Sequence, residues 1–266
     1  MHHQNIRNSI LSLLLTGTLS FLIACKKAGS TGAEQDRPVA EETAKKQMVP
    51  VRFESDQLTI SMKYNPNSAE LIEISGSDGY TTVITYKDHE PFEFKKTKQQ
   101  VPYELVDYIK DKDGLLKARV FNQTGTAYIH KSSYTLRYDQ DQMLLKVSYV
   151  SNSNVPVKDL SFTYRSGNAE TQIIQEYPGQ PKTIDLAYDT KNAVFKHLKY
   201  AERLFLESRY PFFNAGVHNL LKSSEAGQII TSYDYQYNDN DYPSEITVPS
   251  GAKKQTFKII YTELKP

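Results

Sequence analysis

From residue 58 onward, apolar and polar side chains alternate along the chain with a period of two. In the first such segment the apolar face carries Leu58, Ile60, Met62 and Tyr64. The same alternation recurs over residues 134–138, 160–164, 184–188, 233–237 and 257–261. One apolar face and one polar face predict antiparallel strands that are covered on a single side.

A tyrosine closes each repeat of this pattern. The eight closing residues are Tyr64, Tyr86, Tyr108, Tyr138, Tyr164, Tyr188, Tyr237 and Tyr261, and six of their seven spacings lie between 22 and 30 residues. Asn, Asp and Gly follow most of them, and these residues tolerate the backbone of a tight reversal. Segment 103–108 is less regular, because its apolar face also carries Glu104. The repeat predicts a meander of two-stranded hairpins.

The one long spacing, 49 residues between Tyr188 and Tyr237, contains an insertion over 192–224 with a different period. Apolar residues recur there at helical spacing from Phe195 to Phe205, and Tyr210-Pro211-Phe212-Phe213 interrupts them. This pattern predicts one or two short helices near 193–222 that cover the apolar face of the sheet. The predicted fold class is therefore mainly all-β, a large curved antiparallel meander sheet or half-barrel of roughly 12–16 strands with a short helical insertion.

The first 24 residues are typical of a signal peptide. Arg7 supplies positive charge, and residues 10–23 form an apolar run of about 14 residues, shorter than the ~20 needed to span a bilayer. The run ends in Leu22-Ile23-Ala24-Cys25, which resembles a bacterial lipobox, and Cys25 is the single cysteine of the chain. The sequence therefore predicts acylation of Cys25, with palmitate-class chains holding the protein on a membrane. An ordinary signal peptide or membrane helix that contains a cysteine is the alternative.

Residues 25–50 are expected to be a flexible tether. They carry nine charges and few large apolar side chains, so they cannot bury enough surface to offset chain entropy. A flexible coil of this length spans about 28 Å r.m.s.. The remaining residues, 51–266, are predicted to form a single β domain.

Composition narrows the classes of function. The 32 Lys and Arg residues balance 31 Asp and Glu residues, which removes the electrostatic basis for nucleic-acid binding. The single cysteine excludes an intramolecular disulfide framework and a thiolate-built zinc site. The histidine spacings fit no metal motif, and no nucleophile elbow, phosphate loop or dinucleotide fingerprint occurs. We therefore expect a monomer with no cofactor and no metal.

Three Tyr-Asp turn motifs resemble a family of Bacteroidota lipoproteins that is distantly like YD (Rhs-type) repeats. They are Tyr108–Leu115, Tyr138–Asp141 and Tyr188–Asn192, followed by the helical insertion and the late motif at 233–246. The resemblance covers about residues 55–262 and implies a porin-like fold of unknown function, with no residue role to carry over. By resemblance to surface lipoproteins of this phylum, export would need acids close to Cys25, and the first acid is Glu34. The expected location is the outer membrane, with the periplasmic face favoured over the cell surface.

Two functions stay open at this level. The first is a non-catalytic binding module that contacts a glycan, a lipid or an envelope protein, with Tyr200, Tyr210, Phe212 and Phe213 as candidate ligand-contact aromatics. The second is a hydrolase of envelope or dietary polysaccharide that uses a pair of acidic residues in the concave face of the sheet. The absence of a catalytic motif favours binding.

Overall fold

The computed structural model describes residues 47–264 with the exception of 67, 113, 211 and 252. The predicted signal peptide, the lipobox with Leu22, Ile23, Ala24 and Cys25, and nearly all of the tether lie outside these residues. The first strand begins at Met48, three residues before the expected start of the domain.

The described chain forms 17 strands and one helix. The strands of the first half are β1 Met48–Glu54, β2 Thr59–Tyr64, β3 Leu71–Gly76, β4 Tyr80–Lys87, β5 Glu90–Lys98, β6 Val101–Lys110, β7 Leu116–Thr124, β8 Ala127–Tyr138 and β9 Leu144–Ser151. The remaining elements are β10 Pro156–Arg165, β11 Asn168–Glu176, β12 Lys182–Tyr188, α1 Ala201–Glu207, β13 Leu220–Glu225, β14 Gln228–Ser232, β15 Asp234–Tyr237, β16 Pro243–Ser250 and β17 Lys253–Glu263.

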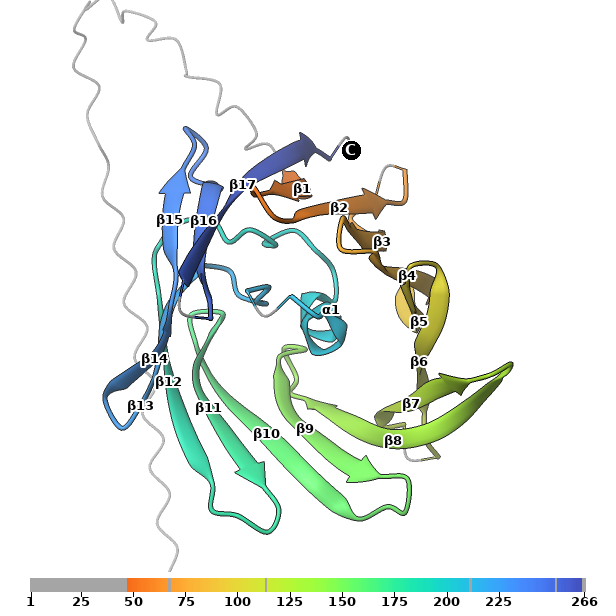
Figure 1. The fold of residues 1–266 in the computed structure, drawn as a ribbon. Helices are drawn as coiled ribbons and strands as arrows, with labels where there is room; N and C mark the ends of the chain where they lie inside the picture. Colours follow the sequence, from red (N-terminus) through yellow and green to blue (C-terminus); the bar gives the residue numbers. More distant parts are fainter. Residues whose placement is uncertain (1–46, 67, 113, 211, 252, 265–266) are drawn as a thin grey trace, which may run out of the picture. The chain divides into compact units, whose positions relative to one another are not determined.

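The strands form one antiparallel meander that curls into a nearly closed barrel (Figure 1). Strand β1 pairs with β17 on one side and with β2 on the other, so the first and last strands close the ring. The single seam lies at β14 and β15, which follow one another with only Tyr233 between them. There β14 pairs back to β13 and β15 pairs forward to β16. The predicted mainly all-β meander is confirmed, and the ring is more complete than a half-barrel.

The apolar face of the sheet points into the barrel. Strand residues such as Phe53, Phe94, Leu136 and Phe257 are almost fully buried there. They form one cluster with side chains of the insertion, namely Val194, Phe195, Leu198, Leu204, Tyr210, Phe212 and Phe213. Figure 1 shows α1 enclosed by the strands. A sheet with one apolar side must cover that side, and the insertion covers it from within.

The insertion is shorter than the predicted range 192–224, and it contains one helix. Residues 220–225 form β13, which pairs with β12, so the apolar Leu220 and Leu221 belong to the sheet. Helix α1 has seven residues, because the backbone of Tyr200 is left-handed and Ser208 is extended. No helix among the described residues is long and apolar enough to cross a membrane.

The tyrosines that close the repeats lie near the ends of alternate strands, next to the turns of one rim. Several of their hydroxyls donate to backbone carbonyls of neighbouring strands: Tyr64 to Pro50 (2.8 Å), Tyr86 to Leu71 (3.1 Å) and Tyr164 to Leu144 (2.9 Å). Burial raises the pKa of these three phenols above the ordinary value. Each of these three tyrosines therefore packs its ring inward, while its hydroxyl makes a hydrogen bond to the adjacent strand.

The outer face of the barrel carries charges paired across strands. Lys63 faces Glu73 with 2.7 Å between Nζ and Oε1, and Lys146 contacts Asp159 at 2.8 Å. Arg119 binds both carboxylate oxygens of its register partner Asp107. Paired charges thus face outward, whereas the almost fully buried apolar side chains face the lumen.

We predict that Phe213→Ala lowers the free energy of unfolding by about 3–5 kcal/mol, because truncating a buried aromatic ring leaves a cavity. The Phe213 ring lies 5.4 Å from that of Phe53 and 4.8 Å from that of Phe195, between centroids. Urea unfolding followed by circular dichroism measures the change. The control is Ile229→Ala, at a residue that is 62% exposed, which should change stability by no more than about 0.5 kcal/mol. Equal effects of the two substitutions would show that the insertion is not part of the core.

Candidate functional site

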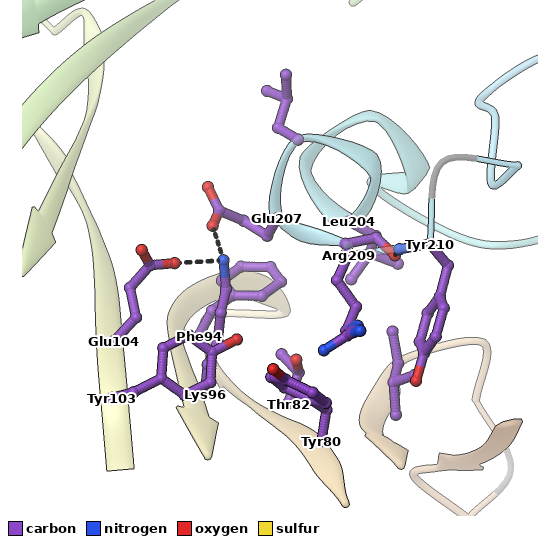
Figure 2. Close-up of a pocket in the computed structure, with 13 residues that line it drawn as sticks. Tyr80, Thr82, Phe94, Lys96, Tyr103, Glu104, Leu204, Glu207, Arg209 and Tyr210 are labelled. Atoms are coloured by element: carbon purple, nitrogen blue, oxygen red, sulfur yellow. Dashed lines mark hydrogen bonds and ion pairs between the residues drawn. The ribbon is translucent and has the colours of Figure 1, made fainter. Parts of the chain in front are cut away.

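A cavity of about 210 Å³ lies between the inner face of β3–β6 and the C-terminal end of α1 (Figure 2). We call it the Lys96 cavity. Its walls combine apolar residues of the barrel and helix with four charged side chains: Lys96, Glu104, Glu207 and Arg209. The combination of apolar walls and a few placed charged groups makes it a candidate binding site.

Lys96 is a buried cation held between two carboxylates. Its Nζ donates to Glu104 Oε1 at 2.8 Å and to Glu207 Oε2 at 2.7 Å, and the Lys96 side chain is 10% exposed (Figure 2). Lys96 and Glu104 are direct register partners on β5 and β6, whereas Glu207 is the last residue of α1. Burial alone would lower the pKa of Lys96, but the two carboxylates outweigh it, so this pKa lies above the ordinary value. The trio fixes the end of the helix to the barrel wall.

A chain of hydrogen bonds continues from Glu207 deeper into the barrel. The Tyr134 hydroxyl donates to Glu207 Oε1, and the oxygen atoms of Tyr108 and Tyr134 lie 2.6 Å apart. Because Tyr134 uses its proton toward Glu207, Tyr108 must donate to Tyr134. Burial raises the pKa of both phenols well above the ordinary value, so both remain neutral donors. Every member of this buried chain therefore has a partner, as the low dielectric of the interior requires.

Arg209 lies flat against an aromatic wall of the Lys96 cavity. Its guanidinium carbon is 3.4 Å from the centroid of the Tyr80 ring, and Asp78 is its ion-pair partner at 3.4 Å. Tyr80 in turn meets Tyr103 edge to face, with 6.0 Å between centroids. The pKa of Tyr80 lies below the ordinary value because Lys98, and next Arg209, favour its ionised form. Stacking leaves the edge of the guanidinium available to hydrogen-bond acceptors.

The four predicted ligand-contact aromatics do not form one surface. Phe212 and Phe213 lie in the core, each 7% exposed, and their rings contact those of Phe257 and Phe53 at tilted angles. Tyr210 borders the Lys96 cavity, and its buried hydroxyl has no hydrogen-bond partner within the described residues. Its ring packs so closely on Gly76 that a Cβ there would collide with the hydroxyl. Ligand contact by these residues stays a prediction.

Tyr200 lines a separate cavity of about 220 Å³ together with Glu202 and residues of the β8–β9 turn. Tyr138 donates to Glu202 Oε1 at 3.1 Å. Burial is the main cause that raises the pKa of Glu202 above its ordinary value. This cavity has mostly apolar walls, such as Leu144, Leu198 and Val217, and a single carboxylate.

The sequence pattern does not predict the charged residues of the Lys96 cavity as a site, although one of them, Glu104, stands out in it. Glu104 interrupts the apolar face of segment 103–108, and the structure shows that it does so because it faces Lys96. Lys96 shares the inward face with Phe94 in the same way. The third partner, Glu207, lies 111 residues from Lys96 in sequence, and no spacing rule connects them.

No group of three or more His, Cys, Asp or Glu side chains within the described part of the chain is arranged to hold a metal ion. Three histidines each make a hydrogen bond to a single side chain: His89 to Glu70 (2.8 Å), His197 to Tyr242 (2.7 Å) and His218 to Asn168 (2.8 Å). The hydrogen bonds from Asn65 and then His89 lower the pKa of Glu70.

Neither a protein-family model nor a curated protein matches the chain. Among solved structures, a porin-like protein from Bacteroides uniformis ATCC 8492 is similar, with 15% sequence identity and a TM-score of 0.50. The match covers 82% of this chain and 96% of that one. A porin-like protein from Bacteroides vulgatus ATCC 8482 matches at 11% identity and a TM-score of 0.49, over 80% of this chain and 99% of that one. At such identity the first match shows the fold alone, and it agrees with the porin-like fold that the sequence motifs implied.

We predict that Lys96→Met lowers the free energy of unfolding by about 3–5 kcal/mol at neutral pH, because two buried carboxylates lose their counter-ion. Denaturant unfolding at pH 7 and pH 4 measures it, and the deficit should shrink at the lower pH as the carboxylates take up protons. The matched control is Lys63→Met on the outer face, where the exposed pair with Glu73 should contribute no more than about 1 kcal/mol. A pH-independent deficit would contradict the ionic origin of the effect.

Proposed function

We propose that this chain is a cell-envelope lipoprotein, anchored to the outer membrane through Cys25, whose barrel acts as a non-catalytic binding module. The observation that carries the proposal is the filled lumen. Insertion side chains pack against the inward strand residues in a single cluster, so small cavities beside α1 take the place of a channel. The outward face supports the same proposal, because paired charges on adjacent strands are unsuited to contact with lipid tails.

An envelope location rests on two supports. The lipobox-like Leu22-Ile23-Ala24-Cys25 is the first. The second is the fold likeness to a Bacteroides protein described as porin-like. A lipid anchor is the expected means of holding a polar-surfaced barrel at the outer membrane, with its domain on the periplasmic side.

The carboxylates of the Lys96 cavity favour binding over hydrolysis. A glycosidase needs one carboxylic acid that keeps its proton and one free carboxylate. Here Lys96 contacts both Glu104 and Glu207, and Tyr134 also donates to Glu207, so both carboxylates are held as ion-pair partners.

The charges on the cavity wall indicate the ligand class. Lys96 and Arg209 balance Glu104 and Glu207, so a ligand with net charge would leave an uncompensated charge in a partly buried site. We therefore propose a small polar ligand without net charge, a sugar or a zwitterion, that hydrogen-bonds to the open edge of Arg209. Two cations already lie over the Tyr80 ring, Arg209 at 3.4 Å and Lys98 at 5.1 Å from its centroid, so we expect stacking of the ligand on this ring to contribute little.

We predict that D-glucose or L-glutamine, as probes of the two uncharged classes, binds the purified protein in isothermal titration. Arg209→Gln should weaken this binding roughly tenfold or more, because hydrogen bonds to charged groups contribute about 1.5–3 kcal/mol. Lys63→Met on the outer face serves as the control. Citrate represents the charged class, and citrate binding that depends on Arg209, with neither uncharged probe bound, would contradict the charge balance. Absence of binding by all three would count against the cavity as a ligand site.

We predict that the wild-type protein incorporates a fatty-acid probe in cells and fractionates with the outer membrane. Cys25→Ser removes the thiol that accepts the lipid, so this variant should lose the label and appear as soluble or unprocessed protein. Protease added to intact cells should spare the domain. Label that persists in Cys25→Ser would disprove the anchor, and digestion on intact cells would place the domain on the cell surface.

A further inference from the structure

A second cavity, of about 360 Å³, lies at the other end of β4 and is independent of the ligand proposed above. Tyr80, the first residue of β4, lines the Lys96 cavity, whereas Lys87, the last residue of β4, lines this one. We call it the Arg203 cavity, after the charged residue of α1 that lies in its wall.

Arg203 is a buried cation whose hydrogen-bonding capacity is poorly filled. The residue is 5% exposed. Its Nη1 donates to the Pro91 carbonyl at 3.3 Å and its Nη2 to Glu90 Oε2 at 3.2 Å, both longer than the 2.7–2.9 Å usual for charge-assisted bonds. Its Nε is buried with no hydrogen-bond partner in the described part of the chain, and Glu202 Oε1 is 4.0 Å away.

Burial would lower the pKa of Arg203, but Tyr138, Glu202 and Glu90 outweigh it and raise this pKa, so the guanidinium stays charged while its Nε has no hydrogen-bond partner among the described residues. The rings of Tyr200 and Tyr108 lie at 4.6 and 5.6 Å from its guanidinium carbon and support it by cation–π contact. Glu90, its carboxylate partner, is 38% exposed and also lies 4.0 Å from Lys110. The two long hydrogen bonds and the unpartnered Nε leave the guanidinium with donor capacity for a further acceptor.

The walls of the Arg203 cavity have a surplus of positive charge. Three cations, Lys87, Lys110 and Arg203, stand against two acids, Asp88 and Glu90. The rest of the wall is largely apolar and includes Phe92 and Leu116. A volume of about 360 Å³ falls within the range of small-molecule sites.

We propose that the Arg203 cavity binds a small organic monoanion, a carboxylate with an apolar body. The carboxylate accepts hydrogen bonds from the Arg203 guanidinium and takes over from Glu90, while the apolar part lies against Phe92 and Leu116. One negative charge neutralises the single surplus cation. A second negative charge would meet the two acids of the wall.

Isothermal titration with benzoate tests this site in the full-length protein, with benzamide as the neutral isostere. Benzoate should bind, and benzamide should bind at least roughly tenfold more weakly, because it lacks the charge that Arg203 recognises. Glu90→Gln removes the competing carboxylate, so it should tighten benzoate binding severalfold. Arg203→Gln should weaken benzoate binding roughly tenfold or more.

The controls separate this site from the Lys96 cavity and from a folding defect. Arg209→Gln should leave benzoate binding unchanged. Circular dichroism reports whether Arg203→Gln still folds. If it does not, Lys110→Gln, at a side chain that is 66% exposed, should weaken benzoate binding in a folded protein. Equal binding of benzamide, benzoate binding lost with Arg209 in place of Arg203, or no tightening in Glu90→Gln would each overturn the proposal.

Discussion

A closed sheet with its apolar face inward must fill its own lumen, and the rest of this structure depends on that constraint. Seventeen strands enclose more space than their own side chains occupy, so the chain supplies a second layer from the segment between β12 and β13. Phe195 of this segment stacks on Phe53 of the wall. Phe213 and Phe212 contact Phe53 and Phe257 with tilted rings. This segment is thus part of the hydrophobic core, and residues of its helix line the Lys96 and Arg203 cavities.

The short helix that fills the lumen carries polar side chains into the core. Their need for hydrogen-bond partners explains the buried charged networks. Helix α1 ends at Glu207 inside the barrel, where its carboxylate would be costly without partners. Lys96 on one side and Tyr134 on another satisfy it, and Glu104 balances the lysine. Arg203, four residues earlier on the same helix, lacks an equally close set of partners. The two ends of α1 therefore differ in how close the hydrogen-bond partners of their charged groups lie.

The sequence predicted the features that local periodicity records. The alternation of apolar and polar residues predicts the strands and their inward face, and the tyrosine spacing predicts successive hairpins. The one spacing of 49 residues locates the insertion that fills the barrel. Closure of the ring by β1 and β17 could not be read from any local pattern, because it joins residues more than 200 positions apart. The same holds for the contact of Lys96 with Glu207. Leu220 and Leu221 fall inside the predicted insertion 192–224 yet belong to β13, since a short apolar run fits a helix as well as a strand.

The two cavities lie toward opposite rims of the barrel, and strand β1 begins at only one of these rims. Met48 pairs with Glu263, two residues beyond the closing Tyr261, so β1 begins at the rim where the tyrosine-closed strands end. The Arg203 cavity belongs to this rim, because the β4–β5 turn that follows Tyr86 contributes to its wall. The Lys96 cavity lies toward the opposite rim, next to Tyr80 and Tyr103 at the starts of β4 and β6. The two rims of the barrel therefore differ chemically. The wall of the Lys96 cavity has as many cations as acids, whereas the wall of the Arg203 cavity has one more cation than acids. The hydrogen-bond chain Glu207–Tyr134–Tyr108 lies between the two cavities.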